Sequence, residues 1–255
     1  MLNTEDKKLL SDFQQAFFND GYNMAKVFLK DGLSLDSLME LTKTLYNYMD
    51  EVTSLFIDHC NRQERRVDCR KGCSICCHQC IMLLPHEAFY LHQYINTQLS
   101  QRGLNEIIAQ ALCKAELTKN MEVEQYVHFK HPCPLLVNDA CIAYEARPIA
   151  CRIYLSSKFE SCNDEYLDPK NFSVFPALYD FPLRTGRMIN EGIYQALLHK
   201  SYSMAELKLE NAIVMMFENN NLTNDWLDKK PIFEQFKHNE LESKYLEKLS
   251  RPSPN

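Results

Sequence analysis

The stretch Cys69-Arg70-Lys71-Gly72-Cys73-Ser74-Ile75-Cys76-Cys77-His78-Gln79-Cys80 places five cysteines within twelve residues. A second set follows it, namely Cys133-Pro134-Leu135, then Cys141-Ile142-Ala143-Tyr144-Glu145-Ala146-Arg147-Pro148, then Cys151-Arg152, and finally Cys162. Clustered thiolates are typical ligands of zinc ions and iron–sulfur clusters. The sequence therefore predicts that the two sets are halves of one metal site, which folding brings together.

Whether the 11 cysteines are metal ligands or form disulfides depends on the cellular compartment in which the chain is expected to fold. The N-terminal residues 1–8 are polar and acidic, without the charged and then apolar order of a signal peptide. No apolar run approaches the length needed to span a bilayer. We therefore expect a cytoplasmic chain with reduced thiols and no membrane insertion. A disulfide-stapled interaction domain is the disfavoured alternative, because the cysteine count is odd and disulfides are rare in the cytosol.

The composition is that of an ordinary globular protein, with 45% hydrophobic and 24% charged residues. A formal net charge of −6 argues against a nucleic-acid partner, which needs a concentrated basic surface. The partner that remains is an unspecified protein or small molecule. Only 6 glycines in 255 residues, together with long periodic segments, favour helices.

We predict a mainly α fold, with residues 1–255 forming a single helical domain. A first helix is expected over about residues 5–30. The next helix has an apolar seam with alternating steps of three and four residues, formed by Leu38, Leu41, Leu45, Tyr48, Val52 and Leu55. Helical stripes return after residue 183, and Ser203 to Glu206 reads as a capping box that opens a helix. Pro231 is expected to open a last amphipathic helix that includes Leu241 and Leu249.

An irregular cysteine-rich region over about residues 69–165 is expected between these helices. Pro85 suits the first turn of a helix, which the sequence predicts Gly103 to interrupt. Cys113 lies among apolar residues and is predicted to be an inert core thiol. Residues 135–144 are predicted to form a short β-hairpin that turns at Asn138-Asp139. Helical periodicity fades over residues 129–183, and a metal would hold so long an irregular stretch in place.

Seven thiols are candidate metal ligands, and they exceed the four that one tetrahedral zinc ion takes. Two cysteines two residues apart, as in Cys73-x2-Cys76, can bind one metal from a tight turn. Cys76 and Cys77 are adjacent, so one of them faces a different metal or does not bind directly. The set suits one four-iron cluster with spare or catalytic thiols, or two metals. Its members are Cys69, Cys73, Cys76, Cys77, Cys133, Cys141 and Cys151.

Arg147 and Arg152 flank Cys151. One interpretation is structural, because guanidinium groups offset thiolate charge, donate hydrogen bonds to sulfur and close the loop. The other is functional, with an arginine holding an anionic substrate or cofactor group such as a carboxylate. The sequence contains no Ser-His-Asp arrangement or acid pair to which catalytic roles can be assigned.

The spacing Cys76-Cys77, then Cys133-Pro134, then Cys141 to Cys151-Arg152 resembles the YkgJ-type cysteine-cluster family over roughly residues 69–152. That family is described as a zinc- or iron-chelating domain, and the resemblance implies metal-site roles for Cys73, Cys76, Cys77, Cys133, Cys141 and Cys151, together with Cys69. Here Cys69 and Cys73 are separated by three residues where two are usual.

The function that follows is a metal-binding protein with an iron–sulfur cluster, [4Fe–4S] being favoured over zinc or iron. A more distant resemblance to flagellin lysine N-methylase implies an alternative, a metal-cluster-dependent protein-modifying enzyme that uses S-adenosylmethionine. No G-x-G-x-x-G loop is present to indicate a Rossmann-type methyltransferase.

Overall fold

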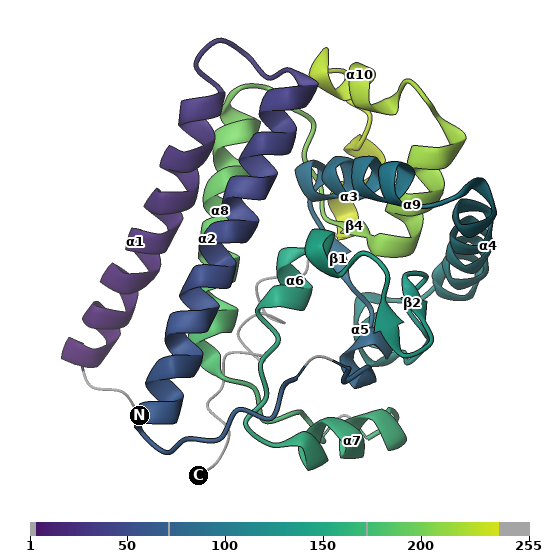
Figure 1. The fold of residues 1–255 in the computed structure, drawn as a ribbon. Coiled ribbons are helices and arrows are strands. Elements are labelled where there is room, and N and C mark those ends of the chain that lie inside the picture. The colour runs from purple at the N-terminus through teal and green to yellow at the C-terminus, as the bar shows by residue number, and fades with distance from the viewer. Residues whose placement is uncertain (1–3, 71, 172, 240–255) are drawn as a thin grey trace.

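The computed structural model describes residues 4–70, 72–171 and 173–239 of the chain. Among these residues the fold is mainly α, as predicted, and the strands pair only as two short antiparallel ribbons. A group of long helices stands on one side of the molecule, and shorter helices surround the rest of the core (Figure 1). No helix of the described part combines the length and apolar character needed to cross a membrane.

The long helices are α1 (Thr4–Phe28), α2 (Leu35–Arg62) and α8 (Asp180–His199). Helix α2 begins at Leu35, because the Ser34 hydroxyl accepts a hydrogen bond from the Ser37 N–H at 3.1 Å and caps the first turn. The first half of the predicted seam is buried, but Leu55 is 59% exposed, so the seam ends earlier than its spacing indicates. The buried hydrophobic residues of α2 are Leu38, Leu41, Leu45, Tyr46, Met49 and Cys60.

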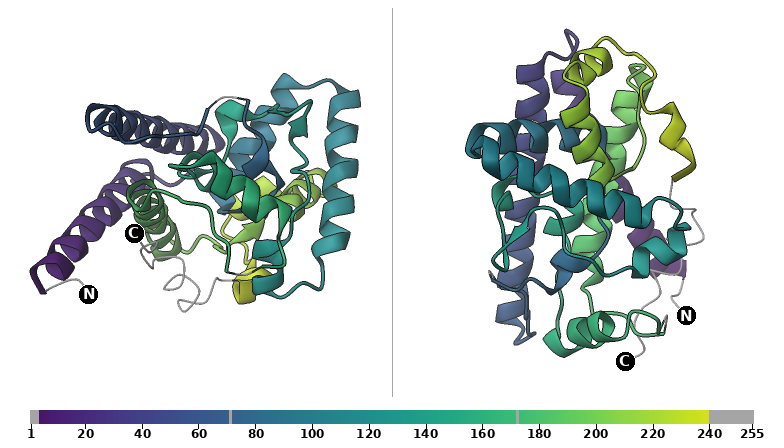
Figure 2. Two further views of the ribbon diagram at one scale, coloured as in Figure 1. Left: turned by 90° about the horizontal axis from the view of Figure 1, so that it is seen from below. Right: turned by 90° about the vertical axis from the view of Figure 1, so that its right-hand side faces the viewer.

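Helices α1 and α8 approach each other closely because two glycines face the opposite backbone. The two helices lie side by side in the left-hand view of Figure 2. A Cβ added at Gly192 would lie 2.1 Å from the carbonyl oxygen of Phe18, and one added at Gly21 would lie 2.0 Å from that of Ile189. Any side chain at either position would force the helices apart.

We expect Gly192→Ala to lower the free energy of unfolding by about 1–3 kcal/mol, the usual cost of overpacking. The clash involves backbone atoms, so rotation of a side chain cannot relieve it. Gly103→Ala is the matched control, because the nearest atom to its added Cβ would be a side-chain carbon at 3.7 Å. That variant should be neutral or slightly stabilising. Urea denaturation measures both, and equal midpoints for the two variants would contradict the prediction.

The shorter helices enclose the other side of the core. The ribbon of β1 (Met82–Leu83) and β4 (Leu207–Lys208) lies beside them, and the ring of Phe89 packs on Trp226 with centroids 5.1 Å apart. Pro85 occupies the first turn of its helix, as predicted, whereas Gly103 lies inside the next helix, and the break falls at Leu99 and Ser100 instead. These helices are α3 (Pro85–Gln98), α4 (Gln101–Thr118), α9 (Leu209–Glu218) and α10 (Leu222–Leu227).

Two further predictions made from local patterns are wrong. Ser203 does not cap a helix, because its hydroxyl accepts the Phe233 N–H and its carbonyl accepts the Trp226 indole N–H, so tertiary partners replace the local ones. Cys113 is exposed on α4 rather than buried in the core. After Pro231 the described chain forms the 3₁₀ helix η3 (Glu234–Asn239), and the predicted Leu241 and Leu249 lie outside the described residues.

The region between the helices is irregular, as predicted, and contains the hairpin of β2 (Leu136–Val137) and β3 (Ala140–Cys141). Asn138 and Asp139 form its turn with φ values of 50° and 58°, which these residue types tolerate. Its helical pieces are η1 (Ile75–His78), α5 (Val123–His128), η2 (Tyr144–Ala146), α6 (Ile149–Arg152) and α7 (Phe159–Leu167). The sequence did not indicate α7, which lies where helical periodicity fades.

Candidate metal centre

The first cysteine set folds into two consecutive tight turns. Gly72 has a φ of +92°, and the Cys73 N–H donates to the Arg70 carbonyl at 3.1 Å, which closes the first turn. The Cys77 N–H donates to the Ser74 carbonyl at 2.9 Å and starts η1. Short turns of this kind hold several thiols close together in space.

Backbone hydrogen bonds join the first set to the second. The Cys133 N–H donates to the Cys77 carbonyl at 2.8 Å, and the His131 N–H donates to the His78 carbonyl at 2.8 Å. The hairpin follows directly, with Cys141 opposite Leu136 in its register. Residues that are 56 positions apart in the sequence, Cys77 and Cys133, are therefore neighbours.

Cys151 reaches the same place on α6, which a buried carboxylate holds. Glu87 is fully buried, and its carboxylate accepts the Leu84 N–H at 3.0 Å and the Ile149 N–H at 2.7 Å. The first bond caps α3 and the second fixes the start of α6, two residues before Cys151. Sequence analysis missed this positioning residue. A glutamate in the first turn after Pro85 was visible, but its partner 62 residues further along was not.

Four thiols are close enough for the charge of one to raise the pKa of another. They are those of Cys77, Cys133, Cys141 and Cys151. Burial raises the pKa of Cys151 well above its ordinary value, and negative charge on the other three raises it further. Burial also raises the pKa of Cys133 to about 12. Buried thiols that would repel each other when ionised are suited to a cation placed among them.

Cys77 differs from the other three thiols. Its interaction with the adjacent Cys76 thiol lowers the pKa of Cys77, while the same interaction and burial raise the pKa of Cys76. The direction of this shift favours the thiolate form of Cys77 over that of Cys76.

The four thiols are not arranged as the ligands of one metal ion. No set of three or more Cys, His, Asp or Glu side chains in residues 4–70, 72–171 and 173–239 is arranged to hold a metal ion as it stands. A backbone hydrogen bond joins Cys133 to Cys77, and coordination of one metal by all four residues requires their thiols to move closer together. The donor set is all sulfur, which fits zinc or an iron–sulfur cluster.

The other predicted ligands are related to a different thiol, that of Cys162. Negative charge on Cys162 raises the pKa of Cys69, and negative charge on Cys73 raises the pKa of Cys162. Cys76 lies between the two groups, because its pKa responds to Cys151 and to Cys69. Cys80 belongs to neither group, since its thiol donates to the Phe129 carbonyl at 3.7 Å.

The two predicted anion-binding arginines make internal contacts. Arg152 is 3% exposed, and its guanidinium donates to the carbonyls of Arg147 and Glu145, pairs with Asp50 and stacks over the Tyr46 ring at 4.1 Å. Arg147 donates to the Tyr144 carbonyl at 2.8 Å, and its positive charge lowers the pKa values of Cys141 and Cys151. These contacts favour the structural interpretation, in which Arg152 closes the loop and Arg147 offsets thiolate charge.

A buried lysine also supports the site. Lys114 is 1% exposed, and its ammonium donates to the carbonyls of Gln79 at 3.2 Å and His131 at 3.0 Å. It thereby joins the first cysteine set to the segment before Cys133, and its charge opposes the rise in the pKa of Cys133. The sequence carried a signal that was missed, because a lysine at the buried positions of a helix stripe, after Ile107 and Ala111, is exceptional.

No protein-family model matches this chain, and neither curated proteins nor solved structures supply a match. The resemblance to YkgJ-type proteins therefore stays a prediction, and the function is argued from the arrangement of the thiols.

Proposed function

We propose that this chain is a metal-binding protein in which Cys77, Cys133, Cys141 and Cys151 hold one metal centre, either an iron–sulfur cluster or a zinc or iron ion. The observation that carries the proposal is the backbone pairing of Cys133 with Cys77, which joins the two cysteine sets within the fold. The resemblance to a metal-chelating family points the same way.

The charge balance of such a centre agrees with its surroundings. Coordination displaces the thiol protons, and four thiolates around a divalent cation or a [4Fe–4S]²⁺ cluster leave a net charge of about −2. Arg147 lies beside Cys141 and Cys151 and offsets part of it. Lys114 lies on the side of Cys133. Both cations serve either kind of centre, so metal analysis has to distinguish them.

We expect anaerobically purified protein to contain metal that survives gel filtration. An iron–sulfur cluster gives a brown solution with about four iron and about four sulfide per cluster. A zinc site gives a colourless solution that contains zinc, and mononuclear iron gives iron without sulfide. Elemental and sulfide analysis with visible spectroscopy separates these results. Cys113→Ser, which changes an exposed thiol on α4, is the control and should leave the metal content unchanged. Protein without zinc or iron would contradict the proposal.

The methyl-transfer alternative gains no specific observation from the described residues. The arginines expected to hold an anionic group are engaged within the protein. It stays a prediction of the sequence, and binding calorimetry with S-adenosylmethionine tests it.

A further inference from the structure

Cys162 lies in the first turn of α7, a helix that apolar burial does not hold in place. Of residues Phe159–Leu167 only Glu165 is buried, while Phe159 is 37% and Leu167 69% exposed. Glu165 pairs with Lys130, and the Tyr166 ring meets His78 of η1 edge-on with centroids 5.0 Å apart. Helix α7 thus docks on the first cysteine set through polar and ring contacts, and Cys162 faces this junction.

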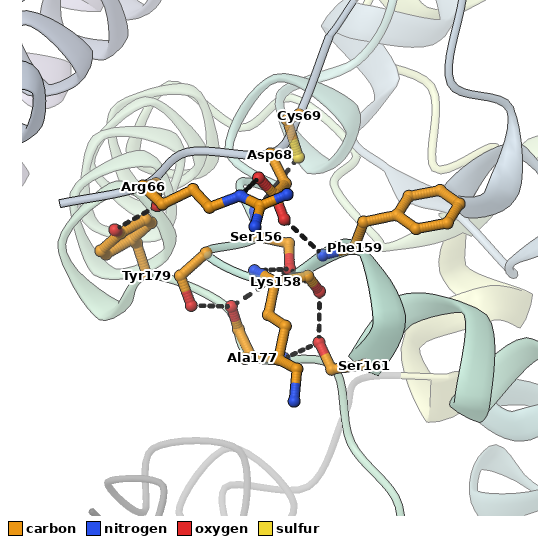
Figure 3. Close-up of polar contacts among 10 residues, drawn as sticks. Arg66, Asp68, Cys69, Ser156, Lys158, Phe159, Ser161, Ala177 and Tyr179 are labelled. Carbon is orange, nitrogen blue, oxygen red and sulfur yellow. Dashed lines mark hydrogen bonds and ion pairs between the residues drawn. The ribbon is translucent and has the colours of Figure 1, made fainter.

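Asp68 and Cys69, at the start of the first cysteine set, are hydrogen-bonded to the chain that leads into α7 (Figure 3). The Asp68 N–H donates to the Ser156 carbonyl at 2.9 Å, and the Asp68 carboxylate accepts the Phe159 N–H at 2.8 Å. The next residue, Cys69, accepts the Ser156 N–H on its sulfur at 3.1 Å and donates to the Tyr154 carbonyl at 3.6 Å. Cys69 is therefore held at the entrance of α7.

One serine contacts the sulfurs of both segments. Besides its N–H bond to Cys69, Ser156 lowers the pKa of the Cys162 thiol through its side chain, which therefore lies near that thiol. Ser156 therefore adjoins both thiols, one through its backbone and the other through its side chain. Cys73 follows Cys69 by one tight turn, and negative charge on Cys73 raises the pKa of both Cys69 and Cys162.

Cys76 completes the group from η1. Negative charge on Cys69 raises the pKa of Cys76. Negative charge on Cys76 and on Cys162 raises the pKa of the same hydroxyl, that of Tyr154. Cys76 and Cys77 are consecutive, so one turn can present a thiol to each side. Cys76 then serves the group around Cys69, and Cys77 serves the group around Cys133.

We propose that Cys69, Cys73, Cys76 and Cys162 form a second metal site, a four-thiol site for zinc or iron that fastens α7 to the first cysteine set. The inference extends the proposed function from one centre to two. Binding displaces the thiol protons to solvent and replaces the hydrogen bond between Cys76 and Cys77. The Ser156 N–H remains as a donor to the bound Cys69 sulfur.

The test compares the full chain with Cys162→Ser and Cys162→His after anaerobic purification. Zinc and iron are counted per chain, and iodoacetamide labelling read by peptide mass spectrometry reports which thiols are protected. We expect all eight thiols of the two groups to be protected in the natural chain. Cys162→Ser should lose the metal of one site and label Cys69, Cys73 and Cys76 at least tenfold faster, while the other four stay protected. Cys162→His should keep both metals, because imidazole is also a ligand.

The remaining outcomes overturn the second site. Unchanged metal content and protection in Cys162→Ser would show that Cys162 is no ligand and leave the first centre standing. Loss of all metal in both variants would show that the eight thiols behave as one unit. Protection of Cys69 and Cys162 that resists a chelator but disappears with a reductant would show a disulfide instead. Natural chain without metal would remove the proposed function as well.

Discussion

Cys151→Ser should remove the metal of the centre formed by Cys77, Cys133, Cys141 and Cys151. The expected loss of affinity exceeds the roughly 10–100-fold that follows removal of a residue that merely orients a ligand. A serine hydroxyl is far less acidic than a thiol and is a poor ligand for soft metals. Because metal binding energy is also folding energy, the irregular segments it joins should open. We therefore expect metal analysis to show loss, and hydrogen exchange to rise over residues 130–156.

The effect should be confined to that part of the molecule. Helices α1 and α8 have their own close packing, so their exchange should stay as in the natural chain. Cys80→Ser is the matched control, because Cys80 belongs to the first cysteine set but bonds to the Phe129 carbonyl instead. Equal metal loss in the two variants, or full metal retention in Cys151→Ser, would show that the site has been placed wrongly.

The sequence predicted the helices that depend on local signals. Ser34 caps α2 in the structure because the polar partners it needs are three residues away. Ser203 carried an equally good local signal, but Trp226 and Phe233 take its carbonyl and hydroxyl, and the segment stays extended. A cap pattern cannot reveal competitors that lie more than 20 residues further along the chain.

The sequence also indicated which thiols are candidate metal ligands, but it could not indicate which of them lie together in the fold. Their density between residues 69 and 151 indicates metal chemistry, whatever the fold. Which thiols meet depends on the hydrogen bond between Cys133 and Cys77 and on the docking of α7, and neither has a local signature. No cysteine lies within ten residues of Cys162 in the sequence, and its relation to Cys69 appears only in the folded chain.

Arg152→Ala should lower the free energy of unfolding by about 2–4 kcal/mol, because it removes charged hydrogen bonds to two partly buried carbonyl groups as well as an ion pair. The guanidinium donates to Arg147 and Glu145 and closes the loop that leads into α6. Its partner Asp50 is 46% exposed and can be rehydrated, which keeps the cost below that of a fully buried pair. Urea denaturation measures the change.

Arg102→Ala is the control for this prediction. Arg102 pairs with Glu106 on the surface of α4 with 90% of its side chain exposed, and such pairs contribute at most about 0.5 kcal/mol. Arg152→Lys should recover only part of the loss, since an ammonium cannot reach two carbonyls and a carboxylate with the planar geometry of a guanidinium. Because the loop carries Cys151, Arg152→Ala should also weaken metal retention. A loss of stability as small as that of Arg102→Ala would mean that the loop closes without the guanidinium.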